Sequence, residues 1–164
     1  MTASTMARRR RSREMAVKVL YQADLSGVSI TEAFQIFCEH FGGSEASKLF
    51  AKELLDGIHA HLDQINSLIS QFSEHWRLDR MSMVDRNVLR LAIYELLCRP
   101  DIPAKVSINE AVELAKKFGT EDSGAFVNGI LDRIRFHLRA GGEGGGQDEK
   151  GGSVSRSRRD RRRR

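Results

Sequence analysis

Val84-Asp85-Arg86-Asn87-Val88-Leu89-Arg90-Leu91-Ala92-Ile93-Tyr94-Glu95-Leu96-Leu97-Cys98 is the most hydrophobic helical stretch in this chain of 164 residues. Its apolar side chains recur so closely that they cover most of the circumference of a helix. A helix of this kind is usually packed on several sides, which places it near the centre of a domain. The stretch therefore predicts an all-α fold with a central helix over residues 84–98.

Apolar residues at helical spacing also mark the rest of the chain. They predict further helices from residue 8 to about residue 23 and over residues 29–41, 44–62, 65–72, 107–118 and 120–138. The pattern leaves open whether residues 65–72 continue the preceding helix. Ser29-x-x-Glu32 and Ser107-x-x-Glu110 have the spacing of capping boxes, which place helix starts at these serines. No segment alternates long enough to predict a strand, so we expect a compact bundle of about seven helices.

Composition narrows the class of protein further. Hydrophobic residues make up 40% and charged residues 30% of the chain, as in globular proteins. No apolar run approaches the roughly 20 residues that span a bilayer, so no membrane partner or secretory signal is expected. Cys38 and Cys98 are isolated from each other, which favours a reducing compartment. The sequence predicts a cytoplasmic protein.

The net charge of +5 is distributed unevenly. Residues 8–13 hold five arginines, and residues 140–164 hold eight Lys/Arg against four Asp/Glu. The intervening residues 14–139 hold 14 Lys/Arg against 18 Asp/Glu and are mildly acidic. Basic ends on an acidic body indicate one local contact with RNA or DNA and leave other surface for a different partner.

The same pattern sets the expected domain organisation. Residues 1–7 are expected to be a flexible N-terminus, 8–139 a single helical domain, and 140–164 a disordered basic tail rich in Gly and Arg. The tail either adds non-specific attraction for RNA or serves only as a solubilising appendage. The arginine run also has two interpretations, a phosphate-binding surface on a helix or a solvated terminus.

Catalytic and metal-binding patterns are absent from the sequence. There is no P-loop, no Gly-x-Gly-x-x-Gly after a strand and no Cys-x-x-Cys. Cys38 and His40, like His59 and His61, are two residues apart and point about 200° apart on a helix, so neither pair can chelate from one face. We expect no enzyme, no metal and no cofactor.

Three segments of the chain resemble the NusB family of bacterial transcription antitermination factors. They are the central stretch quoted above, the segment from Ile102 to Lys116, and the segment from Phe118 to Asp132. Arg13, Ala16, Leu20 and Tyr21 fit the N-terminal pattern of that family, and the resemblance covers roughly residues 8–138.

This resemblance implies a non-catalytic RNA-binding protein. Its expected ligand is boxA RNA in nascent ribosomal RNA leader transcripts, bound together with NusE, a small-subunit ribosomal protein. The wider partner would be the RNA polymerase elongation complex with other Nus factors. The same module also begins a ribosomal RNA cytosine-5 methyltransferase, but no sequence of the length of its catalytic domain follows here. A protein–protein scaffold with incidental RNA affinity is the alternative, and a homodimer that buries the arginines stays open.

The resemblance also implies the residues that contact RNA, each with a competing structural role. They are Arg9, Arg10, Arg13, Arg90, Asp122 and Phe126. Phe126 also fits the apolar stripe of its helix, Asp122 also fits a helix N-terminus, and Arg90 also fits a salt bridge. Arg8 and Arg11 would assist. Gly124 and Ala125 replace polar or basic residues of some relatives.

For the ribosomal protein partner, the matching positions are Tyr21, Asp85 and Glu14. An aromatic ring and acidic groups suit a basic partner. The competing role of Asp85 is helix capping together with Ser82.

Overall fold

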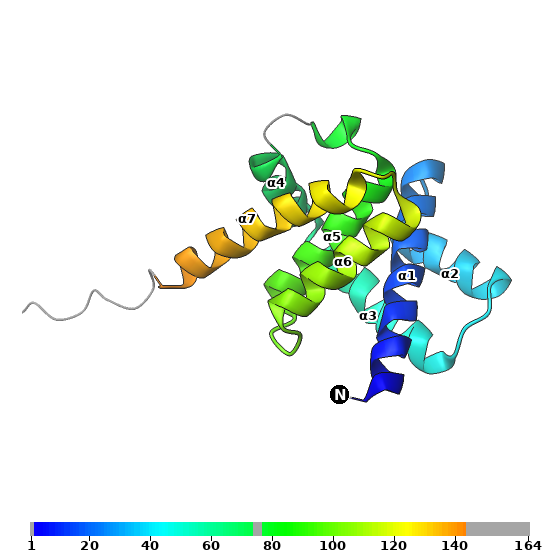
Figure 1. Ribbon diagram of the computed structural model, residues 1–164. Helices are drawn as coiled ribbons and strands as arrows, with labels where there is room; N and C mark the ends of the chain where they lie inside the picture. The colour runs from blue at the N-terminus through cyan, green and yellow to red at the C-terminus, as the bar shows by residue number, and fades with distance from the viewer. Residues whose placement is uncertain (1, 74–76, 144–164) are drawn as a thin grey trace, which may run out of the picture.

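The computed structural model describes residues 2–73 and 77–143, and these residues are almost entirely helical (Figure 1). In chain order the elements are α1 (Ala3–Ser26), α2 (Ile30–His40), α3 (Glu45–Ala60), α4 (Leu62–Phe72), the short 3-10 helix η1 (Leu78–Arg80), α5 (Met83–Cys98), α6 (Ala104–Phe118) and α7 (Ser123–Glu143). No strand occurs within the described ranges, so the prediction of an all-α fold with about seven helices is confirmed. None of these helices is both long and apolar enough to cross a bilayer.

The central position of α5 is also confirmed. This helix packs against α1, α3, α4, α6 and α7, and it lies in the middle of the molecule (Figure 1). All nine residues from Asn87 to Glu95 are buried. Apolar side chains around the whole circumference require neighbours on every side, because burial of apolar surface is the main favourable contribution to folding.

α3 and α4 are two separate helices, which settles the question that the sequence left open. α3 ends at Ala60 and α4 begins at Leu62, with His61 between them. The His61 imidazole Nδ1 lies 2.8 Å from the carbonyl oxygen of Gly57. Gly57 also faces Tyr94, and a Cβ at position 57 would overlap the Tyr94 ring. Glycine is therefore needed where α3 meets the central helix.

One of the two predicted capping boxes is wrong. Ser29 caps α2 as expected, because its hydroxyl accepts a hydrogen bond from the backbone N–H of Glu32. Ser107, however, lies inside α6, which begins at Ala104 directly after Pro103. A proline is tolerated at the start of a helix because the backbone N–H that it lacks would have no hydrogen-bond partner there. The Ser107 hydroxyl is buried instead and donates a hydrogen bond to Glu95 Oε1 of α5 at 2.9 Å.

The ends of the helical body differ from the expected boundaries. α1 begins at Ala3, so residues 3–7 are helical, although the sequence predicted a flexible segment there. α7 continues to Glu143, past the predicted domain end at residue 139, and its last turns project from the body (Figure 1). Residues 144–164 lie outside the described residues, and the disorder expected for them stays a prediction.

A polar cluster joins α1 to α4 and α5. Asp24 Oδ2 accepts hydrogen bonds from Arg86 Nη2 at 2.9 Å, Asn87 Nδ2 at 3.0 Å and Arg90 Nη1 at 3.0 Å. Arg90 Nε donates to Asn66 Oδ1 of α4 at 3.0 Å. Each buried polar group of this cluster has a partner, as burial of charge requires.

Candidate nucleic-acid interface

The helical conformation of α1 divides its arginines between the surface and the core. Arg8, Arg10 and Arg11 are exposed, Arg9 is partly buried, and Arg13 is buried. Successive residues of a helix turn by about 100°, so six consecutive positions necessarily face both solvent and protein. The basic run is therefore a shaped surface of three exposed guanidinium groups on a fixed helix.

Arg13 does not belong to that surface. Its guanidinium donates two hydrogen bonds to Glu95 of α5, from Nε to Oε2 at 2.8 Å and from Nη2 to Oε1 at 2.9 Å. Ser107 of α6 donates to the same Glu95 Oε1 at 2.9 Å. Arg13 is only 3% exposed. A guanidinium with a buried carboxylate partner is not available to a phosphate, so this position supports a structural role for Arg13, and the direct RNA contact stays a prediction.

Arg9 has an intermediate position beside an aromatic ring. Its guanidinium carbon lies 4.8 Å from the centre of the Phe50 ring, and its Nη2 lies 3.9 Å from Asp101 Oδ2. The Arg99 guanidinium also approaches the Phe50 ring, at 5.4 Å. Contacts of this type hold the side chain against the protein. Arg9 therefore fixes α1 on α3 and retains 22% of its side-chain surface.

Two ion pairs join the exposed face of α1 to α6. Arg10 donates to Glu110 from Nη2 at 2.8 Å and from Nε at 3.0 Å. This hydrogen bonding, together with the charge of Glu110, raises the pKa of Arg10. One turn further along α1, Lys117 Nζ donates to Glu14 at 2.8 Å. Arg10 is still exposed over 55% of its side chain, so it can contact a phosphate from this position.

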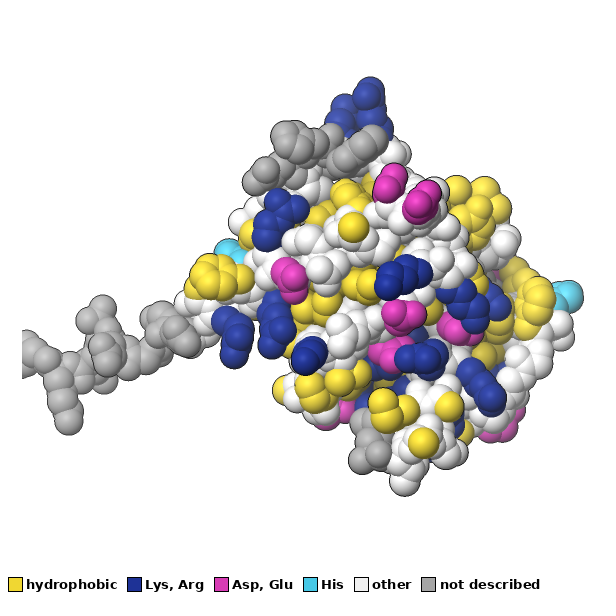
Figure 2. All heavy atoms as spheres, viewed as in Figure 1, with side chains coloured by type: hydrophobic (Ala, Val, Ile, Leu, Met, Phe, Trp, Pro, Cys, Tyr) yellow, Lys and Arg dark blue, Asp and Glu magenta, His cyan; other side chains and the backbone are white. Residues whose placement is uncertain are grey.

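The basic face continues along α1 and α6 toward the start of α7. Lys18 Nζ lies 5.7 Å and Lys117 Nζ 5.5 Å from the centre of the Phe118 ring, at the end of α6. Lys and Arg side chains are spread over this side of the molecule with acidic groups between them (Figure 2). Basic side chains therefore follow the contact between α1 and α6, and α6 ends five residues before the start of α7.

The start of α7 forms a pocket of about 380 Å³ that contains both predicted RNA residues of this helix. Its lining residues are Arg80, Met81, Ser82, Asp85, Thr120, Asp122, Ser123 and Phe126. Asp122 is exposed and Phe126 is partly buried. The pocket combines an aromatic ring, an arginine and two carboxylates, which can stack a base and accept from its amino group.

Asp85 lies in this pocket, although the sequence assigned it to the protein partner. Its backbone N–H donates to the Ser82 hydroxyl at 3.1 Å, so the capping role is present. Its Oδ1 is buried and has no hydrogen-bond partner among the described residues. A buried carboxylate oxygen without a donor costs stability, and in this conformation the atom is not accessible to a bound partner.

Arg90 is placed in the core and not at an RNA surface. It is 9% exposed and bonds to Asp24 and Asn66, as described above. Burial lowers the pKa of Arg90, while the charge of Asp24 opposes that effect. The structure agrees with the alternative role of Arg90 in a salt bridge, and its RNA contact stays a prediction.

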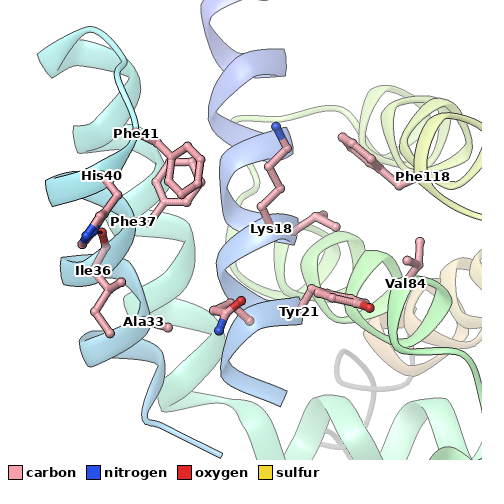
Figure 3. Close-up of a pocket in the computed structure, with 11 residues that line it drawn as sticks. Lys18, Tyr21, Ala33, Ile36, Phe37, His40, Phe41, Val84 and Phe118 are labelled. Atoms are coloured by element: carbon pink, nitrogen blue, oxygen red, sulfur yellow. Dashed lines mark hydrogen bonds between the residues drawn. The ribbon is translucent and has the colours of Figure 1, made fainter. Parts of the chain in front are cut away.

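An apolar groove of about 700 Å³ lies between α1 and α2 (Figure 3). Tyr21 and Lys18 line it from α1, and Ile36, Phe37 and Phe41 line it from α2. Its remaining lining residues are Val17, Gln22, Ala33, His40, Val84 and Phe118. Ile36 is 41% exposed and Phe41 59% exposed, so apolar surface faces solvent here. Such a patch, rimmed by polar residues, is typical of a site for protein–protein contact.

The apolar residues of the helix over residues 29–41 are expected from the sequence to cover one of its faces; they are Ala33, Phe34, Ile36, Phe37 and Phe41. That pattern did not predict that part of this face lines a groove. No local signal could have revealed the partners of Arg10 and Arg13, because Glu110 and Glu95 are 100 and 82 residues away in sequence. Among the described residues, no group of three or more His, Cys, Asp or Glu side chains could hold a metal ion.

These features define an all-helical protein with a basic face on α1 and α6, an aromatic and acidic pocket at the start of α7, and an apolar groove beside them. Residues 10–136 match the model of the NusB family. The chain belongs to the NusB family.

Curated relatives and solved structures agree with this assignment. The chain is 51% identical over 139 residues to the transcription antitermination protein NusB of Myxococcus xanthus, covering 81% of this chain and 98% of the relative. It is 50% identical to that of Desulforudis audaxviator, covering 77% and 92%. A structure of T. maritima NusB superposes with a TM-score of 0.71 at 47% identity, covering 78% of this chain and 90% of that one.

A further similar chain comes from a crystal structure of the antitermination factors NusB and NusE in complex with double-stranded RNA. It superposes with a TM-score of 0.72 at 33% identity and covers 80% of this chain and 98% of that one.

Proposed function

We propose that this chain is a non-catalytic, cytoplasmic transcription antitermination factor. In this role it binds boxA-type single-stranded RNA of nascent ribosomal RNA leader transcripts together with the ribosomal protein NusE. The observation that carries the proposal is the exposed Arg10 on α1, paired with Glu110 of α6, together with a pocket at the start of α7 that contains Phe126, in a member of the NusB family.

The exposed arginines supply affinity in this proposal. Arg8, Arg10 and Arg11 present guanidinium groups that bind phosphate through two donors each. Arg13 acts as a positioning residue, because its buried bonds to Glu95 fix the helix that carries the others. Binding through these groups depends on salt, since each neutralised phosphate releases counterions.

The pocket at the start of α7 discriminates between RNA sequences in this proposal. Phe126 offers a partly exposed ring on which a base can stack, and Asp122 offers a carboxylate that accepts from a base amino group. The RNA in the structure of the similar NusB–NusE complex is double-stranded. An unpaired base fits this pocket better, because the ring stacks only on a base face that is not covered by its neighbours.

The apolar groove supplies the protein contact. Tyr21 lies in it, and Asp85 follows the groove residue Val84 at the start of α5. Glu14 accepts a hydrogen bond from Lys117 of α6. It therefore lies among the basic residues of α1 and α6 and does not line the groove. An apolar groove beside carboxylates, on a body with excess acidic residues, complements a basic ribosomal protein. Assembly with other Nus factors on the RNA polymerase elongation complex, and a homodimer that covers α1 in storage, belong to the same proposal.

Fluorescence anisotropy with boxA RNA and scrambled RNA of equal length tests the function, with and without NusE. We expect preference for boxA and tighter binding when the partner is present. The double variant Arg10→Gln and Arg11→Gln should bind both RNAs more weakly, whereas Lys52→Gln on α3 is the matched control. Lys52 is 57% exposed and pairs with Asp56 of its own helix. Equal RNA binding by the parent and the double variant would instead favour a protein–protein scaffold.

A further inference from the structure

The C-terminal half of α7 carries a second aromatic and basic cluster, formed by Arg133, Arg135, Phe136 and Arg139, which we call the α7 cluster. Phe136 is 76% exposed, more than any other large hydrophobic side chain among the described residues. Ile134 is the last buried residue of α7. His137 still contacts Phe72 and Leu138 packs on the core, and the last turns of the helix project from the body (Figure 1). The Phe136 ring therefore does not serve the core.

The arginines of the α7 cluster surround this ring. Arg133 and Arg139 are three residues before and after Phe136, so they lie on the same side of the helix. Arg135 and Arg139 form no ion pair with any other described residue, in contrast to Arg10 and Arg13. Hydrophobic and basic side chains lie together at the base of the projecting segment (Figure 2).

We propose that the α7 cluster binds single-stranded RNA that continues from the RNA held at the start of the same helix. An exposed aromatic ring among arginines suits unpaired nucleotides, because bases stack on the ring while guanidinium groups bind phosphates. A second copy of this chain fits less well. A two-fold contact would bring two such arginine clusters against each other, and like charges repel.

The geometry of α7 supports a continuous path for the RNA. This inference rests on the proposed function, because the first contact is the Phe126 pocket. Arg133 follows Phe126 by seven residues, or two turns, and so lies on the same face of the helix. Phe136 and Arg139 lie about 80° and about 140° around the helix from Phe126, so the path turns around α7 over an axial distance of about 20 Å. Gly129, between them, is exposed, and a Cβ there would meet no atom within 4 Å, so the surface is open.

The test compares a minimal boxA RNA with the same RNA extended by six uridines at its 5′ or its 3′ end, using the full chain with residues 140–164 in every variant. We expect one of the two extended RNAs to bind the parent about tenfold more tightly than the minimal RNA. Phe136→Leu and Arg139→Gln should lose most of this gain and bind the minimal RNA as the parent does. Leu49→Ala, at an exposed apolar position on α3, is the matched control.

Three results would overturn the inference while leaving the proposed function intact. The first is that neither extension tightens binding by the parent. The second is that the gain persists in both Phe136→Leu and Arg139→Gln. The third is that Phe136→Leu changes only the oligomeric state measured by sedimentation. Failure of the parent to bind the minimal RNA would overturn the proposed function itself, and the inference with it.

Discussion

Arg13 and Glu95, 82 residues apart in the sequence, form a buried ion pair with two hydrogen bonds of 2.8 and 2.9 Å. The pair joins α1 to the central helix α5, and Ser107 adds α6. A run of arginines that looks uniform in the sequence is thereby divided into exposed groups and one structural group. The exposed groups depend on the buried one for their position.

Arg13→Gln should destabilise the protein by about 3–5 kcal/mol, because removing one partner leaves Glu95 as an uncompensated buried charge. Urea unfolding followed by circular dichroism measures this free energy. Arg11→Gln, at an exposed position of the same helix, should change it by less than about 0.5 kcal/mol. Parent-like stability of Arg13→Gln combined with weak RNA binding would show that Arg13 contacts RNA directly.

Asp24 should contribute stability that is lost in acid. Burial raises the pKa of Asp24, but the hydrogen bond from Asn87, the charge of Arg90 and the hydrogen bond from Arg86 together lower it below the ordinary 3.8. A carboxyl group whose pKa is lower in the folded than in the unfolded state stabilises the folded protein. The stabilisation is complete at pH values above the unfolded-state pKa, and it is lost as the pH falls through the folded-state pKa.

Asp24→Asn should therefore be less stable than the parent at pH 7, since it leaves the buried Arg90 without its carboxylate partner. The difference should shrink below about pH 4, where the parent carboxyl becomes protonated. Unfolding in urea at a series of pH values gives the free energy of unfolding of both proteins. A difference that stays constant down to the acid limit would contradict the assigned role of this carboxylate.

Glu110→Gln should tighten RNA binding several-fold at low salt. Glu110 holds Arg10 through two hydrogen bonds, so its neutralisation leaves the guanidinium free for a phosphate. The plot of log affinity against log salt should steepen by up to about 0.7, and Arg10→Gln should make it shallower by a similar amount. Unchanged slopes in both variants would place the RNA elsewhere.

Phe126→Leu should weaken binding of boxA RNA by about 1–3 kcal/mol, the contribution of a base stacked on an aromatic ring. Leucine keeps apolar volume beside the core, so the stability cost should stay below about 1.5 kcal/mol. Anisotropy titration and urea unfolding measure the two quantities. A loss of stability without a loss of RNA affinity would show that Phe126 only packs in the core.

Ile36→Glu should weaken binding of the protein partner at least tenfold, because a carboxylate would enter the apolar groove between α1 and α2. Binding of RNA alone should not change. Leu49→Glu introduces the same charge at an exposed apolar position outside the groove and is the control. Equal loss in both variants would point to a general effect of charge.

The sequence predicted most of the fold and part of the site. The central helix, the all-α class and the cap at Ser29 follow from local patterns, because apolar periodicity and capping act over a few residues. The same local reasoning failed at Ser107. Its spacing imitates a capping box, but Pro103 starts the helix earlier and burial gives the serine another partner.

By itself, the sequence determined that the chain forms helices, which of them is central, and that basic charge gathers before residue 14. Only the tertiary structure decided which arginines are available. Arg13 and Arg90 are buried in ion pairs, Arg10 is paired with Glu110, and Arg139 of the α7 cluster is exposed beside Phe136. The physical reason is that helical periodicity is encoded over neighbouring residues, whereas the partner of a charge is set by contacts between segments that are far apart in the sequence.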